Sequence, residues 1–414
     1  MYSWIIAVCL SVGVIVAHFT GVSWTCMLIG LSVGAVFLVL QYKFKIHPLP
    51  IFVWNVILVG AMWYTIRSQI HEKFAEDDSP SFIENVSHRV SSATRGYMIR
   101  SGISEQDVNV LNAMLLGDRD SLHYEQKMRF RNAGVQHLLA LSGLHLGIFI
   151  GILSFLFLRR ARYSRWRWPV LLGTLTLLWG YCLVAGLPQS LLRAMLMTTL
   201  YYVCLYLRSY INSAVTLANT AWLMILIDPN AVFDLGTQLS FVAVAAILWI
   251  YPQLSNMLPL QYFPKTRWGG ASRRLWSLFC VSLAAWFGTM PLCLYYFHQF
   301  QPWQPLTSVV LVPLTSLLLY FTVVLLTICL LHLWMLAGLA AKVVSAFMIV
   351  ENTILEFAGS LPFSTLRCSN IHLGHVALLY LLMFIYVVGA SSTRRVQRYA
   401  FLSLVATIVV LLLV

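Results

Sequence analysis

Long apolar stretches recur along almost the whole chain, and this feature limits the possible folds more than any other. An α-helix needs about 20 consecutive apolar residues to cross the hydrocarbon core of a bilayer. Of the 414 residues, 60% are hydrophobic and 10% are charged, whereas soluble domains carry about 25% charged residues. These values exclude a soluble enzyme, a coiled coil and a disordered chain. We therefore predict an all-α polytopic membrane protein with about 11–13 transmembrane helices.

Charged residues orient these spans. The stretches long enough, or nearly long enough, to cross the bilayer lie at about 4–19, 22–41, 50–66, 135–158, 169–186, 190–207, 213–227, 236–251, 276–297, 303–331, 333–350, 372–389 and 399–414. With a cytoplasmic N-terminus, the inner loops hold clusters of Lys and Arg and no acidic residue. All 14 Asp and Glu residues then lie on the outer side, and Glu351 and Glu356 fall just after a span that ends near residue 350. This positive-inside pattern predicts a multi-pass membrane protein whose N-terminus is cytoplasmic.

Residues 67–134 form the long stretch that does not resemble a span. Ser81 with Glu84, and Ser104 with Asp107, have the spacing of helix N-terminal caps, and each pair precedes an amphipathic run. A turn at Gly117 and a third helix over about 122–131 complete the segment. We therefore expect short, outward-facing amphipathic helices on the outer membrane surface between N-terminal transmembrane helices (1–66) and a second membrane domain (135–414).

Polar residues inside apolar spans are costly, so they are the candidates for function. Ser142 and Gly143 interrupt one span, and His145 follows one turn later. A helix that begins inside the membrane presents free N–H groups that favour anions. The alternative is a close helix crossing that needs small residues, with no ligand involved.

A second group of polar residues lies between the next two spans and in the helix that follows them. Gln189 and Arg193 lie just after Pro188, which breaks the chain between two spans. Gln238 and Ser240 lie within a later span, and Asp234 stands at its mouth, where it could neutralise Arg193. An arginine near mid-bilayer costs at least about 2.5–3.5 kcal/mol unless it faces protein, water or a partner. Near the surface the same side chain could instead reach the headgroups at little cost.

Enzymatic motifs are missing from the sequence. It contains no phosphate-binding loop, no histidine–carboxylate metal motif and no nucleophile elbow, so we expect no enzyme, no cofactor and no metal site. A hydrolytic pair of Ser142 and His145 remains an alternative, although the neighbouring sequence offers no acid to orient the histidine.

Three ordered blocks of sequence resemble the ComEC family of competence proteins. The first contains Met114, Gly117 and Arg119 and continues through Val135-Gln136-His137 to Ser142-Gly143-Leu144-His145. The second and third are Pro188-x-Ser190-x2-Arg193-Ala194 and Leu235-Gly236-x-Gln238-Leu239-Ser240-Phe241. The resemblance covers about 105–330 and implies a membrane channel for DNA uptake in natural transformation. Many members also carry an OB-fold domain, whose place is filled here only by the helical stretch 67–104, and a nuclease-like domain, for which we expect no counterpart. We therefore expect either the membrane channel domain alone, in 135–414, or a divergent relative with another cargo.

The resemblance implies single-stranded DNA as cargo, a cytoplasmic helicase-like ATPase and an extracytoplasmic DNA receptor as partners, and a homodimer as one assembly to consider. Ser142, Gly143, His145, Gln189, Arg193, Gln238 and Ser240 are the residues expected to line or shape the DNA path. Three alternatives stay open: a transporter of small molecules or lipid-linked substrates, an intramembrane hydrolase, and an inactive paralogue. The apparent lack of a buried mid-span carboxylate argues against proton coupling in the first of these.

Overall fold

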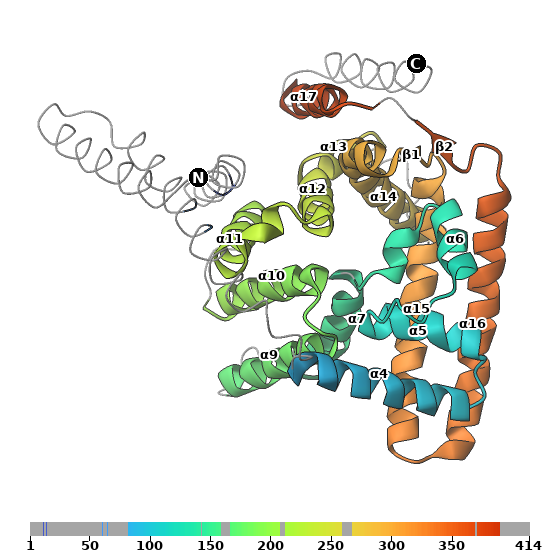
Figure 1. The fold of residues 1–414 in the computed structure, drawn as a ribbon. Helices are drawn as coiled ribbons and strands as arrows, with labels where there is room; N and C mark the ends of the chain where they lie inside the picture. Colours follow the sequence, from blue (N-terminus) through green and yellow to red (C-terminus); the bar gives the residue numbers. More distant parts are fainter. Residues whose placement is uncertain are drawn as a thin grey trace, which may run out of the picture. The chain divides into compact units, whose positions relative to one another are not determined.

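The computed structural model describes residues 11, 14, 60, 64, 82–141, 143–158, 166–207, 212–258, 267–368 and 371–389. The described chain is helical almost throughout, and its strands are the two-residue pair β1 (Gln299–Phe300) and β2 (Leu366–Arg367). The predicted all-α class is therefore confirmed (Figure 1). Apart from residues 11, 14, 60 and 64, the predicted spans at 4–19, 22–41, 50–66 and 399–414 lie outside the described residues.

The chain forms two compact units. The first comprises Met1–Val86 and Phe149–Phe241, and the second comprises Ser87–Ile148 and Val242–Val414. The predicted domain limits at residues 67 and 135 were based on hydropathy alone, and they stay a prediction.

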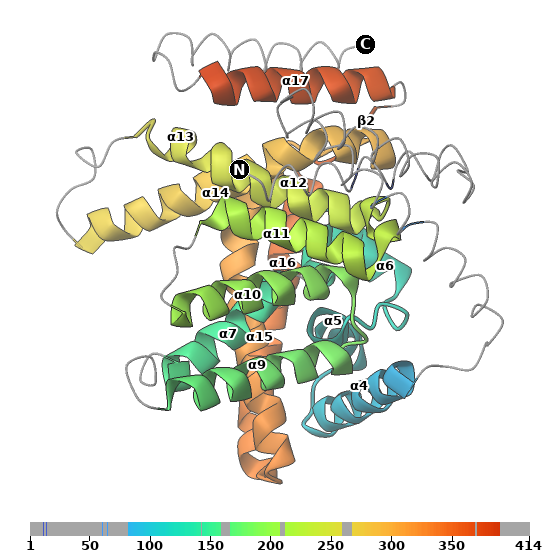
Figure 2. The same ribbon diagram turned by 90° about the vertical axis from the view of Figure 1, so that its left-hand side faces the viewer.

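Three apolar helices make up most of the described residues of the first unit: α9 (Arg167–Val184), α10 (Gln189–Tyr206) and α11 (Ser213–Ile227). Figure 2 shows α10 between α9 and α11, and it packs against both of them. The short 3-10 helix η3 (Pro229–Val232) then leads to the start of α12 (Leu235–Trp249). These helices lie within two residues of the predicted spans.

The second unit begins at Ser87, inside the first of three helices in the segment 67–134. These helices are α4 (Phe82–Arg100), α5 (Glu105–Leu116) and α6 (Tyr124–Asn132). Ser104 caps α5 by accepting a hydrogen bond from the Asp107 backbone N–H, and Gly117 ends that helix with φ of 81°. Both features match the sequence analysis. One difference is that α5 is buried on all sides over 108–116 instead of along one apolar face.

The span predicted at 135–158 is divided in the structure. A 3-10 turn, η1 (Gln136–Leu139), precedes α7 (Gly143–Leu153), and α7 passes into the π-helical segment η2 (Ser154–Leu158). The predicted interruption and the helix start at Gly143 are therefore present. Ser142 itself lies outside the described residues.

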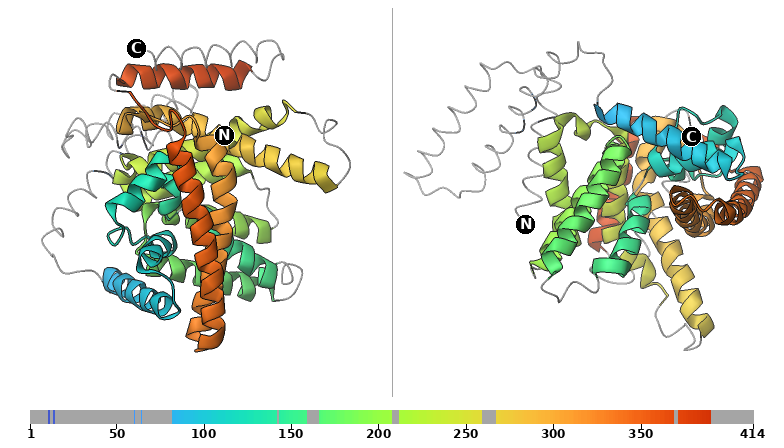
Figure 3. Two further views of the ribbon diagram at one scale, coloured as in Figure 1. Left: turned by 90° about the vertical axis from the view of Figure 1, so that its right-hand side faces the viewer. Right: turned by 90° about the horizontal axis from the view of Figure 1, so that it is seen from below.

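Long helices dominate the rest of the second unit. After α13 (Tyr251–Ser255) come α14 (Arg267–Phe297), α15 (Gln304–Leu330), α16 (Trp334–Ser360) and α17 (Leu373–Gly389). Helices α15 and α16 form an antiparallel pair along their length (Figure 3). At the turn between them His332 takes a left-handed φ of 57°, and the N–H of Leu333 donates to the carbonyl of Ile328. This is the backbone pattern that commonly ends a helix.

Four helices of the described chain are long and apolar enough to cross a membrane: α9, α14 from Gly270, α15 and α16. Shorter apolar helices lie at Ser213–Ile227, Leu235–Trp249 and Leu373–Met383. The chain is therefore a membrane protein. Many large apolar side chains of α15 and α16 are exposed, as expected for surfaces that face lipid.

Helix α16 corrects one prediction. The sequence placed Glu351 in an outer loop after residue 350, but α16 continues to Ser360 and Glu351 is fully buried inside it. The error arose because a carboxylate was taken as the end of a span. Because the described chain does contain a buried carboxylate within an apolar helix, a transporter coupled to protons is no longer disfavoured on that ground.

Candidate functional site

The turn between α9 and α10 positions the first residues of the site. Gly186, with φ of 80°, follows the end of α9, and the N–H of Leu187 donates to the carbonyl of Cys182. Pro188 then precedes the first residue of α10, Gln189. A left-handed residue followed by proline stops one helix and lets the next begin in a new direction. Arg193 is thereby placed in the second turn of α10, on its buried side.

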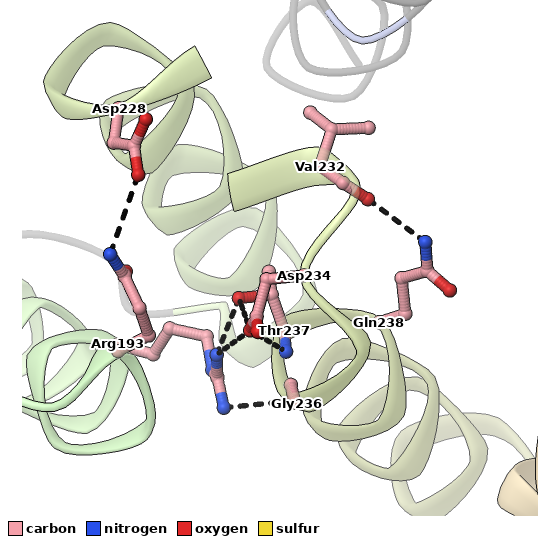
Figure 4. Close-up of polar contacts among 8 residues, drawn as sticks. Arg193, Asp228, Val232, Asp234, Gly236, Thr237 and Gln238 are labelled. Carbon is pink, nitrogen blue, oxygen red and sulfur yellow. Dashed lines mark hydrogen bonds and ion pairs between the residues drawn. The ribbon is translucent and has the colours of Figure 1, made fainter. Parts of the chain in front are cut away.

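Arg193 is almost completely enclosed, with 3% of its side chain exposed. Its Nη1 donates to Thr237 Oγ1 at 2.7 Å, and its Nη2 donates to the backbone carbonyl of Gly236 at 2.9 Å (Figure 4). Its Nε, also buried, has no hydrogen-bond partner among the described residues. The guanidinium is therefore anchored to the first turn of α12 by two directed bonds, and one donor is unused.

Asp234 neutralises this cation from the rim of the site. Its Oδ2 lies 3.9 Å from Arg193 Nη1, and 42% of its side chain is exposed. The same oxygen accepts hydrogen bonds from the Thr237 backbone N–H at 2.6 Å and from the Thr237 hydroxyl at 2.7 Å. A carboxylate that accepts the N–H three residues later is the standard cap of a helix N-terminus. Asp234 thus caps the N-terminus of α12 and neutralises the charge of Arg193, as the sequence predicted for this pair.

Thr237 connects the two charges. A hydroxyl can donate one hydrogen bond and accept two, so its proton goes to Asp234 while a lone pair receives Arg193. Thr237 was not among the residues expected to form the site. The signal was present, because a threonine three residues after an aspartate is at the position whose N–H the cap binds.

Two glutamines lie near this cluster. Gln189 Nε2 contacts Asp228 Oδ2 at 3.5 Å, the weak limit of a hydrogen bond, and Asp228 itself caps η3 through the Asn230 N–H. Gln238 Nε2 donates to the backbone carbonyl of Val232 at 3.0 Å. Figure 4 shows Gln238 directed toward Val232, on the opposite side from Arg193. Gln238 therefore holds the loop before α12 in place.

The other predicted residues are placed as follows. Ser240 is half-buried on α12. Gly143 is exposed at the start of α7, and His145 is buried one turn on. These last two residues belong to the second compact unit.

The cluster keeps the guanidinium of Arg193 away from water near the N-terminal end of the apolar helix α10. Within the described part of the chain, no group of three or more His, Cys, Asp or Glu could hold a metal ion. The Arg193 cluster itself offers charge and hydrogen bonding: a guanidinium, the N-terminus of α12 and the exposed carboxylate of Asp234. Such an arrangement suits the recognition of an anionic group if Asp234 yields its place.

Residues 114–393 match the family model described as Competence protein. The chain is 29% identical over 262 residues to ComE operon protein 3 of Bacillus subtilis, which covers 62% of this chain and 31% of that protein. It is 29% identical over 167 residues to competence protein ComA of Neisseria gonorrhoeae, covering 39% and 24% of the two chains. It is also 27% identical over 216 residues to the uncharacterised protein YcaI of Escherichia coli, covering 50% and 27%. No solved structure matches the chain.

Proposed function

The chain belongs to the competence protein family, and on that premise we propose that it forms a channel for single-stranded DNA in the bacterial cytoplasmic membrane. In this proposal it carries the strand into the cytoplasm during natural transformation. The observation that carries the proposal is the family match over 114–393, which includes Gly143, His145, Arg193 and Gln238. One of the relatives is named a competence protein, which favours DNA as the cargo.

The chemistry of the Arg193 cluster supports this cargo. DNA is a polyanion, and a narrow conduit needs cationic or dipolar groups that attract phosphate but release it again. Arg193 supplies one buried cation with an unused Nε donor, and Asp234 limits its net charge. Arg193, Gln189, Gln238, Ser240, Ser142, Gly143 and His145 remain the proposed path residues. The protein acts as a conduit in this proposal and carries out no chemical step.

The chain spans between about a quarter and a third of the length of the curated relatives. We further propose that a cytoplasmic helicase-like ATPase supplies the energy and that an extracytoplasmic receptor delivers the DNA. We also propose that the N-terminus is cytoplasmic and that the protein assembles as a homodimer. The basic inner loops predicted from the sequence would face the emerging strand in this orientation.

Complementation of a deletion strain tests the proposal. Wild type should restore transformation, and Arg193→Ala should not, at equal membrane abundance. Arg89→Ala is the matched control, because it removes the same charge from an exposed position of α4, outside the inner loops, and should leave transformation intact. If Arg193→Ala fails to accumulate, Arg193→Lys is tested in its place. Lysine keeps the charge but replaces the two-nitrogen contact of the guanidinium by a single ammonium group. Wild-type transformation by both Arg193 variants would refute the role of Arg193.

A transporter of small molecules or lipid-linked substrates is the second candidate. The buried carboxylate of Glu351 favours it, because ion-coupled carriers use such groups. The same experiment separates the two functions. If deletion of the gene leaves transformation unchanged, DNA is not the cargo and the transporter is favoured.

A further inference from the structure

The α15–α16 pair has a regular buried seam. On α16 the buried residues follow alternating steps of four and three: Ala337, Ala341, Val344, Met348, Glu351, Leu355 and Ala358. On α15 the residues Ser308, Thr315 and Thr322 are spaced by seven, as are Leu311, Leu318 and Leu325, and all six are buried. This spacing is that of two helices packed as a coiled coil. The acidic residue in the α16 seam is Glu351.

One of the two carboxyl oxygens of Glu351 accepts a hydrogen bond. Thr315 Oγ1 donates to Glu351 Oε1 at 2.7 Å. The other oxygen, Oε2, is buried and has no hydrogen-bond partner among the described residues. Glu351 itself is 0% exposed. It lies nine residues from the end of α16, about 14 Å along the helix axis at 1.5 Å per residue.

No cation of the described chain lies within ion-pair distance of Glu351. Helices α15 and α6 pack against α16, and α4 contacts its first residue. Helix α15 contributes Tyr320 and Cys329 as titratable groups; α6 contributes Tyr124, Glu125, Lys127, Arg129 and Arg131; α4 contributes Tyr97 and Arg100 at Trp334; and α16 itself carries Lys342 and Glu356.

The cations among these groups are engaged elsewhere, lie far along the helix or, as for Lys127 of α6, are exposed to solvent. Arg129 pairs with Glu356 at 3.2 Å, and Arg131 Nε donates to Gln299. Arg100 stacks on Trp334 at the opposite end of α16 from Glu356. Lys342 lies nine residues before Glu351, about 14 Å away along the helix.

We propose that Glu351 is a proton-binding site within the α15–α16 pair, and that it must release and rebind this proton for the protein to work. A buried carboxylate with one hydroxyl donor and no counter-charge carries a large desolvation penalty, whereas the neutral acid does not. In the resting state the proton is on Oε2, and Thr315 donates to the carbonyl oxygen Oε1. Release transfers the proton from Glu351 to water and leaves a carboxylate in which one oxygen accepts no hydrogen bond. The α15–α16 seam must therefore open or admit a new hydrogen-bond donor.

The competing interpretation is that Glu351 and Thr315 only fix the register of the two helices. A single polar pair in a coiled-coil seam is known to have that effect. The two interpretations differ in what a neutral substitute does. Glutamine has nearly the same shape as the protonated acid and keeps an oxygen for Thr315, so it preserves register but cannot release a proton.

Infrared spectroscopy of the full chain in lipid bilayers tests the site without reference to its cargo. We expect a carboxylic-acid carbonyl band that persists at a pH where exposed carboxyl groups have lost theirs. This band should be absent in Glu351→Gln and present in Glu356→Gln, the matched control five residues along, whose carboxylate is 61% exposed. Thr315→Val should shift the band to higher frequency, because Oε1 loses its hydrogen bond. A spectrum unchanged by Glu351→Gln would overturn the proposal.

Transformation assays test whether the proton must move, and this readout alone rests on the proposed function. At equal abundance, we expect Glu351→Gln to lose DNA uptake and Glu356→Gln to keep it. Full uptake by Glu351→Gln would leave Glu351 as a register element and overturn the coupling. Should Glu351→Gln not accumulate, Glu351→Asp keeps a titratable group on a shorter side chain and should retain the acid band with reduced uptake. If the gene deletion itself leaves transformation unchanged, the infrared result still decides whether Glu351 binds a proton.

Discussion

Replacing Thr237 by valine removes one hydroxyl from the Arg193 cluster and leaves the shape of the side chain nearly unchanged. The hydroxyl accepts from Arg193 at 2.7 Å and donates to Asp234 at 2.7 Å. Asp234 keeps the Thr237 backbone N–H at 2.6 Å after the change, so the cap of α12 survives. The main loss is therefore one hydrogen bond from a buried, charged donor.

The magnitude follows from the burial of that donor. A hydrogen bond to a charged group contributes about 1.5–3 kcal/mol, and Arg193 is only 3% exposed, so water cannot replace the lost acceptor. Thr237→Val should therefore lower the free energy of unfolding by about 1.5–3 kcal/mol. That corresponds to a shift of roughly ten- to 150-fold in the unfolding equilibrium.

Thr220→Val is the matched control in the same compact unit. Thr220 is also fully buried, but its hydroxyl bonds only to the Thr216 carbonyl one turn earlier in α11. Such intrahelical bonds add little, so the expected loss is below about 1 kcal/mol. Reversible unfolding of both variants in mixed detergent micelles, followed by tryptophan fluorescence, measures the difference. Equal losses for the two variants would show that Thr237 does not anchor Arg193 by this bond.

Two glycine substitutions test the packing of the second unit by the same unfolding assay. Gly288→Ala would bring a Cβ into overlap with Ala246, and such overpacking should lower the free energy of unfolding by about 1–3 kcal/mol. Gly338→Ala in α16 has open space around the new Cβ and should be neutral or stabilising. Equal effects of these two changes would argue against a close contact at Gly288. Gly117→Ala should lose at least about 1–2 kcal/mol, because its φ is 81° and the new Cβ would lie 2.6 Å from Leu141 Cδ1; an unchanged midpoint would mean that this turn relaxes freely.

Local features of the fold were predictable because each depends on a few neighbouring residues. Ser104 caps α5 and Gly117 ends it, as their sequence positions predicted, since capping requires only a short polar side chain or a residue that tolerates positive φ. The break before α10 followed from Pro188 in the same way. The limits of α9 to α12 followed from hydropathy within two residues, whereas α14 begins nine residues before its predicted span and α16 ends ten residues after its own.

The polar contacts were only partly predictable. Arg193 and Asp234 could be paired because few charges lie within the apolar part of the chain, and opposite charges there need each other. The place of Thr237 between them depends on the rotation of α10 against α12, which hydropathy does not encode. Glu351 was misplaced for a related reason, because a carboxylate was read as the end of a span.

The sequence by itself determined the helical membrane class, the order of the described helices, the break at Pro188 and the family. These depend on local composition and spacing, which are complete in a one-dimensional string. The tertiary structure alone decided that Thr237 joins Arg193 to Asp234 and that Glu351 faces Thr315 in a closed seam. Helix rotation and register determine which polar groups meet, and they are set by the packing of many side chains at once.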